Sequence, residues 1–371
     1  MTAGYDLAIV GAGICGLAHA LIASRRGRRV IVIDRDLAAN GASIRNFGFI
    51  TVTGQERGRS WRHARRSRDI WAEIAPDAGI PVVQRGLLVL GRRPETMAVL
   101  EAFRQDEMGA ACTLLGRDAL SAWPGLRGDA MLGALYSPHE MRVESREAIP
   151  RLARWLEERH GVTFLRGVSV FSVAPPRLET SRGVVHADAA IVCPGDDFHT
   201  LFPDRIRRHG LTRCTLQMMR LAPGGIDVAQ PAVMSDLGVG RYRGYRHLPG
   251  HGALTARLAA EQPDHLAAGI HLIAVRAADG SQIVGDSHVY ADQPDPFSDE
   301  RVDDLVLSEH AAVHRATPPV VSRWTGTYAS GPETMLMERL SDSARLVIVS
   351  SGTGASTAFG IAEETLADLW G

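Results

Sequence analysis

The 371-residue sequence contains no lysine, so its basic side chains are all arginine or histidine. Without lysine the chain cannot form a lysine Schiff base, which excludes pyridoxal-phosphate and lysine-aldolase mechanisms. A Walker phosphate-binding loop also needs a lysine and is excluded. The 41 basic and 42 acidic residues give a net charge of −1, whereas nucleic-acid binders usually carry a basic excess. The composition therefore favours small molecules over nucleic acids as partners.

Cysteine is also scarce. The four cysteines lie far apart and form no CxxC pair: Cys15, Cys112, Cys193 and Cys214. Neither a disulfide framework nor a zinc site is expected from this spacing, and no metal ligands are assigned. The pattern is typical of a protein in a reducing cytoplasm.

Long hydrophobic segments are rare, and the one near the N-terminus covers residues 7–23. It resembles a signal peptide, but Asp6 precedes it in place of a basic region and glycines interrupt it. We interpret it as a strand, a turn and a helix, and expect a soluble cytoplasmic protein without membrane contact. The apolar content of 45% and charged content of 22% are those of a globular chain, long enough for two domains.

The N-terminal segment predicts a βαβ unit. Residues 6–10 form a short apolar run, a glycine-containing turn follows at 11–16, and a helical segment continues to about Gly27. Residues 30–33 form a second apolar run, which ends at Asp34. Continuous apolar runs of this length are typical of strands buried on both faces of a parallel sheet.

The rest of the chain repeats this device at its other end. An apolar strand at 346–349 runs into Gly352-Thr353-Gly354, and a helix follows to Leu369. Between the ends, we expect an amphipathic helix over 147–158, strands at 86–90, 162–173 and 189–193, and several short strands over 212–290. The prediction is an α/β protein with a Rossmann-like domain of discontinuous segments (1–85, 145–215 and 320–371) and an inserted antiparallel-sheet substrate domain (86–144 and 216–319).

The two glycine turns point to a flavin dinucleotide. Gly11, Gly13 and Gly16 match G-x-G-x-x-G between a strand and a helix, where a diphosphate rests on the positive helix end. Asp34 stands about 20 residues further on, where a carboxylate holds ribose hydroxyls. Gly352 begins the second turn, whose backbone N–H groups would suit the pyrimidine end of a flavin. The alternative is a glycine-rich helix entry without a ligand.

A third glycine loop makes a family resemblance specific. The chain resembles the D-amino acid oxidase superfamily of FAD-dependent amine oxidases, which includes glycine oxidase and sarcosine oxidase. The run Ser43-Ile44-Arg45-Asn46-Phe47-Gly48, together with Gly285-Asp286-Ser287-His288, is most similar to a subgroup linked to phosphonate catabolism. The matching marks extend over residues 4–369 and are GAGICG, Asp34, the G-A-S-x-x-N-x-G loop at 41–48, Val170, Pro194-Gly195, Trp324-Thr325-Gly326, and the terminal GTG with Gly360.

The resemblance implies FAD as the cofactor. It places the ribose at Asp34 with Arg35 nearby, the diphosphate near Ser43, the adenine at the backbone of Val170, and the isoalloxazine at 352–354. The cofactor-binding residues it implies are Gly11, Gly13, Ile14, Gly16, Asp34, Arg35, Ser43, Asn46, Val170, Gly195, Gly352, Thr353 and Gly354.

Two departures from the relatives affect the expected substrate. Glycine oxidase-like members carry a W-x-G-x-R run whose arginine binds the substrate carboxylate, and Tyr328 takes that position here. A planar bidentate carboxylate clamp is therefore missing from this position, which argues against an α-amino acid. Sarcosine oxidase-like members use a lysine after the terminal glycines for oxygen activation, and Ser356 stands there.

Arginines must then bind the substrate anion. We expect catalytic roles for Arg45, Tyr328 and His288, and substrate contacts from Arg241, Tyr242 and Arg323. Arg243 and Arg246 are further candidates, and the alternation over 241–246 predicts a strand with 241, 243 and 245 on one face.

The expected reaction is the FAD-dependent oxidative deamination of a small anionic amine, with O₂ as acceptor and hydrogen peroxide as product. The subgroup resemblance implies 2-aminoethylphosphonate or its N-methyl form, giving an aldehyde and ammonia or methylamine. One alternative is an oxidase or dehydrogenase of a small or secondary amino acid such as glycine, sarcosine or proline. A different class is an FAD-binding protein without turnover.

Overall fold

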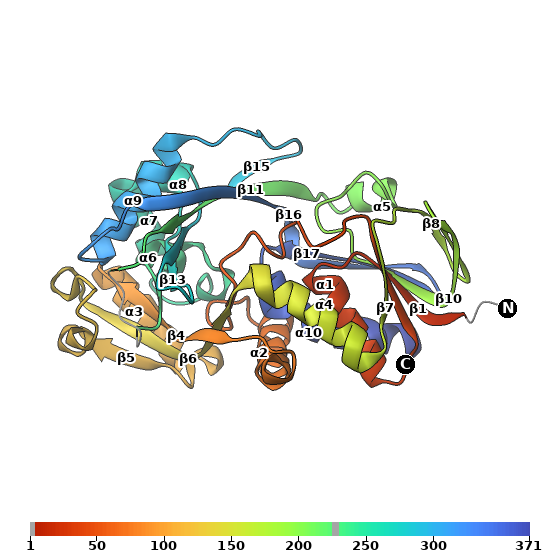
Figure 1. The fold of residues 1–371 in the computed structure, drawn as a ribbon. Helices are drawn as coiled ribbons and strands as arrows, with labels where there is room; N and C mark the ends of the chain where they lie inside the picture. The colour runs from red at the N-terminus through yellow and green to blue at the C-terminus, as the bar shows by residue number, and fades with distance from the viewer. Residues whose placement is uncertain (1–3, 225–229) are drawn as a thin grey trace.

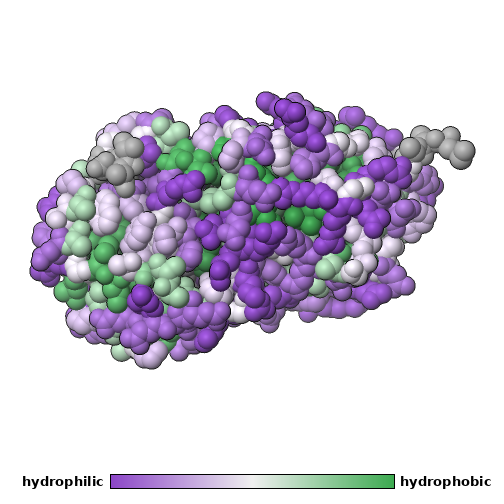
Figure 2. Space-filling model, turned by 90° about the horizontal axis from the view of Figure 1, so that it is seen from below, coloured by the Kyte–Doolittle hydropathy of each residue, from purple (hydrophilic) through white to green (hydrophobic). Residues whose placement is uncertain are grey.

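The computed structural model describes residues 4–224 and 230–371. It has two parts at opposite ends of an elongated molecule, and both chain termini lie in the same part (Figure 1). Hydrophilic side chains cover most of the face seen in Figure 2, with small hydrophobic areas between them. None of the described helices combines the length and the apolar character needed to cross a lipid bilayer.

The part that holds the termini is built on a parallel sheet with the strand order β7–β2–β1–β10–β17. Its central strands are continuous apolar runs buried on both faces, as the sequence predicted. The sheet thus joins segments from both ends of the chain. Its members are β1 (Tyr5–Val10), β2 (Val30–Asp34), β7 (Thr163–Arg166), β10 (Gly183–Val192) and β17 (Ala344–Ser351).

Helices cover this sheet, and α1 packs against both α10 and α4. Leu17, Leu21 and Phe359 are among the fully buried side chains of this interface. The helices are α1 (Ile14–Arg25), α2 (Arg59–Asp77), α4 (Ser145–His160), α5 (Pro203–Arg207) and α10 (Gly354–Trp370). The antiparallel pair β8 (Val170–Ala174) and β9 (Arg177–Thr180) extends from the beginning of β10.

The second part is built on a mostly antiparallel sheet with the order β5–β6–β4–β12–β13–β14–β11–β16. Only the β4–β12 pair is parallel among these described strands, while β3 adds to β6 and β15 adds to β11. The strands are β3 (Phe49–Ile50), β4 (Val82–Gly91), β5 (Thr113–Gly116), β6 (Gly133–Val143), β11 (Thr212–Leu221), β12 (Ala232–Met234), β13 (Ile273–Arg276), β14 (Gln282–Gly285), β15 (Val289–Ala291) and β16 (Val320–Ser341).

One long strand connects the two parts. The first half of the 22-residue β16 pairs with β11, and its second half pairs with β17. In Figure 1 it runs from the helices of the second part toward the parallel sheet. Side chains on β16 can therefore face the glycine turns and the second sheet at the same time.

Five helices accompany the second sheet: α3 (Pro94–Gln105), α6 (Asp236–Arg241), α7 (His251–Glu261), α8 (Pro263–Ala267) and α9 (Glu300–Val313). The short helix α6 is held by a buried ion network at its first residue. The Asp236 carboxylate has no exposure and accepts hydrogen bonds from Arg92 at 2.8 Å and from Arg93 at 2.7 Å. Arg92 also pairs with Glu309 of α9. The network therefore connects α6 to α9 and to the segment between β4 and α3 that carries the two arginines.

The fold confirms the predicted α/β class, with a Rossmann-like domain of discontinuous segments and an inserted sheet domain. Two details differ. The predicted boundaries at 85 and 215 fall inside β4 and β11, which belong to the second sheet because each strand pairs there over its length. The strand predicted over 241–246 is wrong, since this segment is the end of α6 followed by a 3₁₀ turn at Arg243–Tyr245.

Candidate active site

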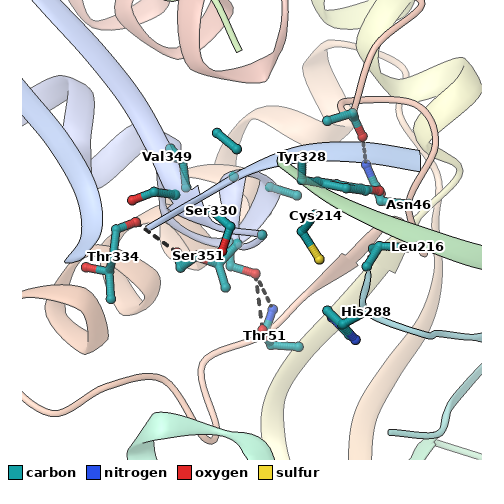
Figure 3. A pocket seen from close by; sticks show the side chains of 18 of the residues that line it. Asn46, Thr51, Cys214, Leu216, His288, Tyr328, Ser330, Thr334, Val349 and Ser351 are labelled. Carbon is teal, nitrogen blue, oxygen red and sulfur yellow. Dashed lines mark hydrogen bonds between the residues drawn. The ribbon is translucent and has the colours of Figure 1, made fainter. Parts of the chain in front are cut away.

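A cavity of about 350 Å³ lies between the two parts. Its walls come from the beginning of α1, the loop after β2, the turn between β17 and α10, and the facing surface of the second sheet. In Figure 3, Thr334, Val349 and Ser351 lie toward one end, and Leu216 and His288 lie toward the other. The predicted residues that line it are Gly13, Ile14, Ser43, Asn46, Gly195, Arg241, Tyr242, His288, Tyr328, Gly352, Thr353 and Gly354.

The first glycine turn brings the backbone close to the cavity. Gly11 has a φ of +106°, and a Cβ built on it would lie 2.3 Å from the carbonyl oxygen of Cys193. Only glycine fits this position. Gly13 is the N-cap of α1, so the positive end of this helix lies at the cavity. Gly16 lies behind the turn, where a Cβ would meet the Gly11 carbonyl.

The loop after β2 rests on this helix end. The Ser43 hydroxyl accepts a 2.9 Å hydrogen bond from the N–H of Ile14, which positions Ser43 beside the glycine turn. Asn46 holds the loop itself: its amide donates to the carbonyl of Ala42 at 2.8 Å and accepts from the N–H of Gly48 at 2.7 Å. Asn46 thus lines the cavity, but its side-chain bonds are made within the protein.

Asp34 lies at a second cavity of about 320 Å³, which Ala12 also lines. Its carboxylate accepts hydrogen bonds from the N–H groups of Ala12 at 2.5 Å and Asp36 at 2.8 Å. A carboxylate offers about four acceptor positions, so two remain for ribose hydroxyls. Ala12 lines this cavity and its neighbour Gly13 lines the first one, so the glycine turn borders both cavities.

Among the described residues that line the two cavities, neither Arg35 nor Val170 is found. Arg35 forms a 2.6 Å ion pair with Asp197 in the loop after β10. Val170 begins β8 with its side chain buried, and it pairs with Thr180 across β9.

The C-terminal turn forms a further part of the cavity wall. Gly352, Thr353 and Gly354 all line the cavity, and Thr353 is the N-cap of α10. Ser356, at the position of the lysine in sarcosine oxidase-like proteins, is buried and accepts a 2.9 Å hydrogen bond from the N–H of Thr51 (Figure 3). A second glycine turn at a helix N-terminus therefore lines the same cavity beside the first one, since a Cβ on Gly354 would lie 3.4 Å from the Ile14 side chain.

The predicted substrate groups separate into two sets. Arg241 and Tyr242 line the cavity, and Arg241 donates a 2.6 Å hydrogen bond to the hydroxyl of Tyr290. Arg45 and Arg323 are not among the described residues that line the cavity. The Arg45 guanidinium donates to Asn40, and Arg323, on β16, pairs with Asp303 of α9 at 2.6 Å. The predicted roles of these two guanidinium groups at the substrate do not fit this placement.

Three buried side chains stand together beside Tyr328: His271, Asp286 and His288. Burial raises the pKa of Asp286 to about 7, and the charge of Arg241 opposes this rise. Burial also lowers the pKa values of His271 and His288 well below the usual range, so both rings are neutral. Sequence reasoning identified His288 but missed the other two. The short Gly285–His288 run was a signal for Asp286, while His271 joins the group only through tertiary structure.

A second cluster lies under the first glycine turn and contains Cys15, His19 and Cys193. The His19 Nδ1 atom is 2.7 Å from the carbonyl oxygen of Cys15, so it must donate there and has no free lone pair for a metal. Hydrogen bonding from Cys193 lowers the pKa of the Cys15 thiol, and the same contact raises that of Cys193. The cluster packs the turn against β10.

The family follows from a comparison with known proteins. The model of the family described as FAD dependent oxidoreductase matches residues 6–369. The chain therefore belongs to this family of FAD-dependent enzymes.

Individual relatives match more distantly. A segment of 162 residues is 32% identical to D-amino acid dehydrogenase 2 of Mesorhizobium japonicum and covers 40% of this chain and 38% of the relative. A segment of 210 residues is 26% identical to glycine oxidase of Geobacillus kaustophilus and covers 53% of this chain and 55% of the relative. These matches thus span only about two fifths and about half of the lengths of the curated relatives.

Solved structures share the fold. L-proline dehydrogenase from P. horikoshii superimposes with a TM-score of 0.78 at 17% identity, over 98% of this chain and 93% of that one. Glycine oxidase from Geobacillus kaustophilus superimposes with a TM-score of 0.75 at 17% identity, over 99% of this chain and 95% of that one. At these identities the likeness defines the fold alone.

The residues present fit FAD. The two cavities lie at adjacent residues of the glycine turn, and the site offers a helix N-terminus for the diphosphate and free acceptor positions on Asp34 for ribose. A Cβ on Gly13 would lie 2.9 Å from the Ser43 hydroxyl, so glycine at this position lets the Ser43 loop rest on the helix end. Residues 352–354 would lie at the flavin end.

Proposed function

We propose that the protein oxidises a small amine that carries an anionic group, with an aminophosphonate such as 2-aminoethylphosphonate or its N-methyl form as the substrate. The observation that carries the proposal is the composition of the cavity beyond the glycine turns. It combines polar groups at 271, 286 and 288, the first two of them buried, with guanidinium groups at 241, 243 and 246, and it has Tyr328 where resembling enzymes keep a carboxylate-binding arginine.

The overall reaction converts R–CH₂–NH₂, O₂ and water into R–CHO, ammonia and hydrogen peroxide, and an N-methyl substrate releases methylamine instead. When bound, FAD supplies the two-electron acceptor for this oxidation. The chain itself positions the amine and excludes water from it. The buried side chains of Leu216 on β11 and Tyr328 on β16 form the part of the cavity wall that does this.

The arginines suit a phosphonate because this group offers three acceptor oxygens to N–H donors. Arg241 stands at the end of α6, and Arg243 and Arg246 follow in the next turn. Arg243 also donates to the carbonyl of Pro332 at 2.9 Å and pairs with Glu56 at 3.4 Å. Arg241 is therefore the guanidinium that we assign to the substrate anion.

A second candidate function is the oxidation or dehydrogenation of a small or secondary amino acid such as glycine, sarcosine or proline. The names of the relatives favour it, since they include a glycine oxidase and an amino acid dehydrogenase. A third possibility, an FAD-binding protein without turnover, is opposed by the cavity of about 350 Å³ beside the glycine turns, which charged and polar side chains line.

The test is anaerobic reduction of the FAD-loaded protein by a panel of amines, followed by measurement of peroxide under air. We expect kcat/KM to be higher for the two aminophosphonates than for glycine, sarcosine or proline. Faster turnover of the amino acids would establish the second candidate function, and no flavin reduction by any amine would establish the third. Reduction that releases no peroxide but reduces an artificial acceptor would define a dehydrogenase.

A further inference from the structure

The His271–Asp286–His288 cluster joins three segments of the second sheet. His271 lies just before β13, Asp286 directly follows β14, and His288 directly precedes β15. One ligand atom from each of the three lies within 4.8 Å of the other two. Two backbone hydrogen bonds hold His271 beside Asp286. The N–H of Asp286 donates to the carbonyl of His271 at 3.1 Å, and the N–H of His271 donates to the carbonyl of Asp286 at 3.3 Å.

The cluster contains acceptors without a donor. The Nδ1 atom of His288 is 2.8 Å from the carbonyl oxygen of Gly269, so Nδ1 carries the proton and Nε2 presents a lone pair. That Nε2 atom is 3.9 Å from one oxygen of Asp286, and Nδ1 of His271 is 3.1 Å from the other. Within the described part of the chain, neither this oxygen nor Nδ1 of His271 has a hydrogen-bond partner.

In the His271 tautomer whose Nδ1 is unprotonated, three acceptors face one another and need a ligand that only donates. His271 and Asp286 are each 4% exposed, so bulk water is largely excluded from them, and all three residues line the cavity. A protonated amine carries up to three N–H donors and a positive charge, which matches three acceptors around one carboxylate. A divalent cation would use the same atoms, but the positive charge of Arg241 acts on Asp286 and disfavours a doubly charged ion more than a singly charged one.

We propose that His271, Asp286 and His288 bind the ammonium group of the substrate and that the Asp286 carboxylate accepts one of its protons before oxidation. The proton passes from R–NH₃⁺ to the carboxylate, which yields R–NH₂ and a neutral carboxyl group. The amine thus regains the lone pair that an oxidation at the neighbouring carbon requires. This inference rests on the proposed function, because it assumes that an amine is the substrate.

The proton transfer should depend on pH through Asp286. The groups that act on it or face it come from several elements: His271, His288, Arg241 at the end of α6, Tyr242, Cys214 on β11 and Tyr328 on β16. Burial keeps the two histidines and the tyrosines neutral. Asp286 is therefore the member of this set that titrates near neutral pH, with a pKa of about 7.

The test compares Asp286→Asn with the wild type in binding amino and des-amino ligands of equal charge at the anionic end. The pairs are 2-aminoethylphosphonate with ethylphosphonate, and glycine with acetate. Calorimetry on the reduced, FAD-loaded protein without oxygen prevents turnover. We expect Asp286→Asn to lower the affinity for the amino ligand by about 30-fold or more and the affinity for the des-amino ligand by less than about 3-fold. An equal loss for both ligands, or no loss, would overturn the inference.

The control variant is Asp303→Asn, which changes another buried aspartate that binds Gln217 and Arg323 away from the cavity. It should leave both affinities near the wild-type values. In a second measurement, wild-type kcat/KM should rise with pH through about 7, and Asp286→Asn should lack this rise. Retention of the rise in the variant would refute Asp286 as the proton acceptor.

Two further outcomes separate competing explanations. Equilibrium dialysis against zinc ions tests the metal alternative, and one zinc per chain that is lost in Asp286→Asn would overturn the ammonium assignment. If amino acids rather than aminophosphonates reduce the flavin, the proposed substrate is wrong, while the glycine and acetate pair still tests the cluster. If no amine reduces the flavin, the proposed function fails independently of the binding result.

Discussion

The hydroxyl of Tyr328 donates a 2.8 Å hydrogen bond to the backbone carbonyl oxygen of Arg45. This contact connects β16 to the loop after β2, and Trp324 donates to the same carbonyl at 3.3 Å. Burial raises the pKa of Tyr328 far above its usual value, so the side chain stays a neutral phenol. Its proton is used within the protein, and the carboxylate clamp of the resembling enzymes is not replaced at this position.

Replacement of Tyr328 by Phe should therefore weaken the fold more than it changes substrate charge recognition. The Arg45 carbonyl would lose its shorter hydrogen bond and keep the longer one from Trp324. We expect a loss of about 0.5–1.5 kcal/mol in the free energy of unfolding, measured by urea denaturation. A preserved stability together with a large loss of affinity for the anion would show that the hydroxyl binds the substrate instead.

Arg241 and Arg45 should respond differently to replacement by Ala. Arg241 lines the cavity, whereas the Arg45 guanidinium donates to Asn40 outside it. Loss of a charged partner from a buried contact costs roughly 2–4 kcal/mol, which is about 30- to 1,000-fold in kcat/KM. We expect Arg241→Ala to fall in this range with the anionic amine and Arg45→Ala to change by less than about 3-fold. A larger loss of kcat/KM in Arg45→Ala than in Arg241→Ala would show that Arg45 binds the substrate anion.

Gly13→Val should prevent FAD binding. Its side chain would meet the Ser43 hydroxyl and occupy the approach of the diphosphate to the helix N-terminus. The purified variant should lack the flavin absorbance and take up no FAD on reconstitution. The matched control is Gly116→Val, at the end of β5, where a Cβ would meet no atom within 4 Å. Full flavin content in Gly13→Val would contradict the proposed diphosphate site.

Asp286 should make the stability of the protein fall as the pH rises. Its pKa is about 7 in the folded protein against 3.8 ordinarily, so the native state holds a proton that the unfolded chain releases. The stabilisation is fully present below about pH 4 and is lost as the pH passes through about 7. Between about pH 5 and pH 8, the wild type should lose about 2–3 kcal/mol relative to Asp286→Asn. Parallel pH profiles of unfolding free energy for the two proteins would contradict the raised pKa.

Asp236→Asn should destabilise the second domain. Asp236 is fully buried between Arg92 and Arg93, and its loss leaves two guanidinium groups without their shared carboxylate. Breaking a buried ion pair costs about 3–5 kcal/mol. The exposed pair of Asp204 and Arg207 serves as the control, and Asp204→Asn should cost less than about 1 kcal/mol. Similar losses for both variants in thermal unfolding would refute this role of the network.

The sequence alone determined the parallel-sheet domain and its glycine turns. The turn at 11–16 is recognisable from its glycine spacing alone, while the close approach that restricts Gly11, to the carbonyl of Cys193, appears only in the folded chain. The apolar runs of β1, β2 and β10 likewise indicate burial on both faces without knowledge of their partners. The family resemblance followed from the same local motifs.

Only the tertiary structure decided the substrate compartment. The alternation over 241–246 predicted a strand, yet this segment holds the end of α6 and a 3₁₀ turn, and α6 begins at Asp236, which two arginines from a segment about 140 residues earlier in the chain hold in place. Arg45 and Arg323 were expected at the substrate, but the loop and the register of β16 turn their guanidinium groups toward Asn40 and Asp303. His271 and Asp286 meet because β13 pairs with β14, and their altered pKa values arise from burial. Strand pairing between distant segments and exclusion of water are properties of the whole fold, so no local pattern contains them.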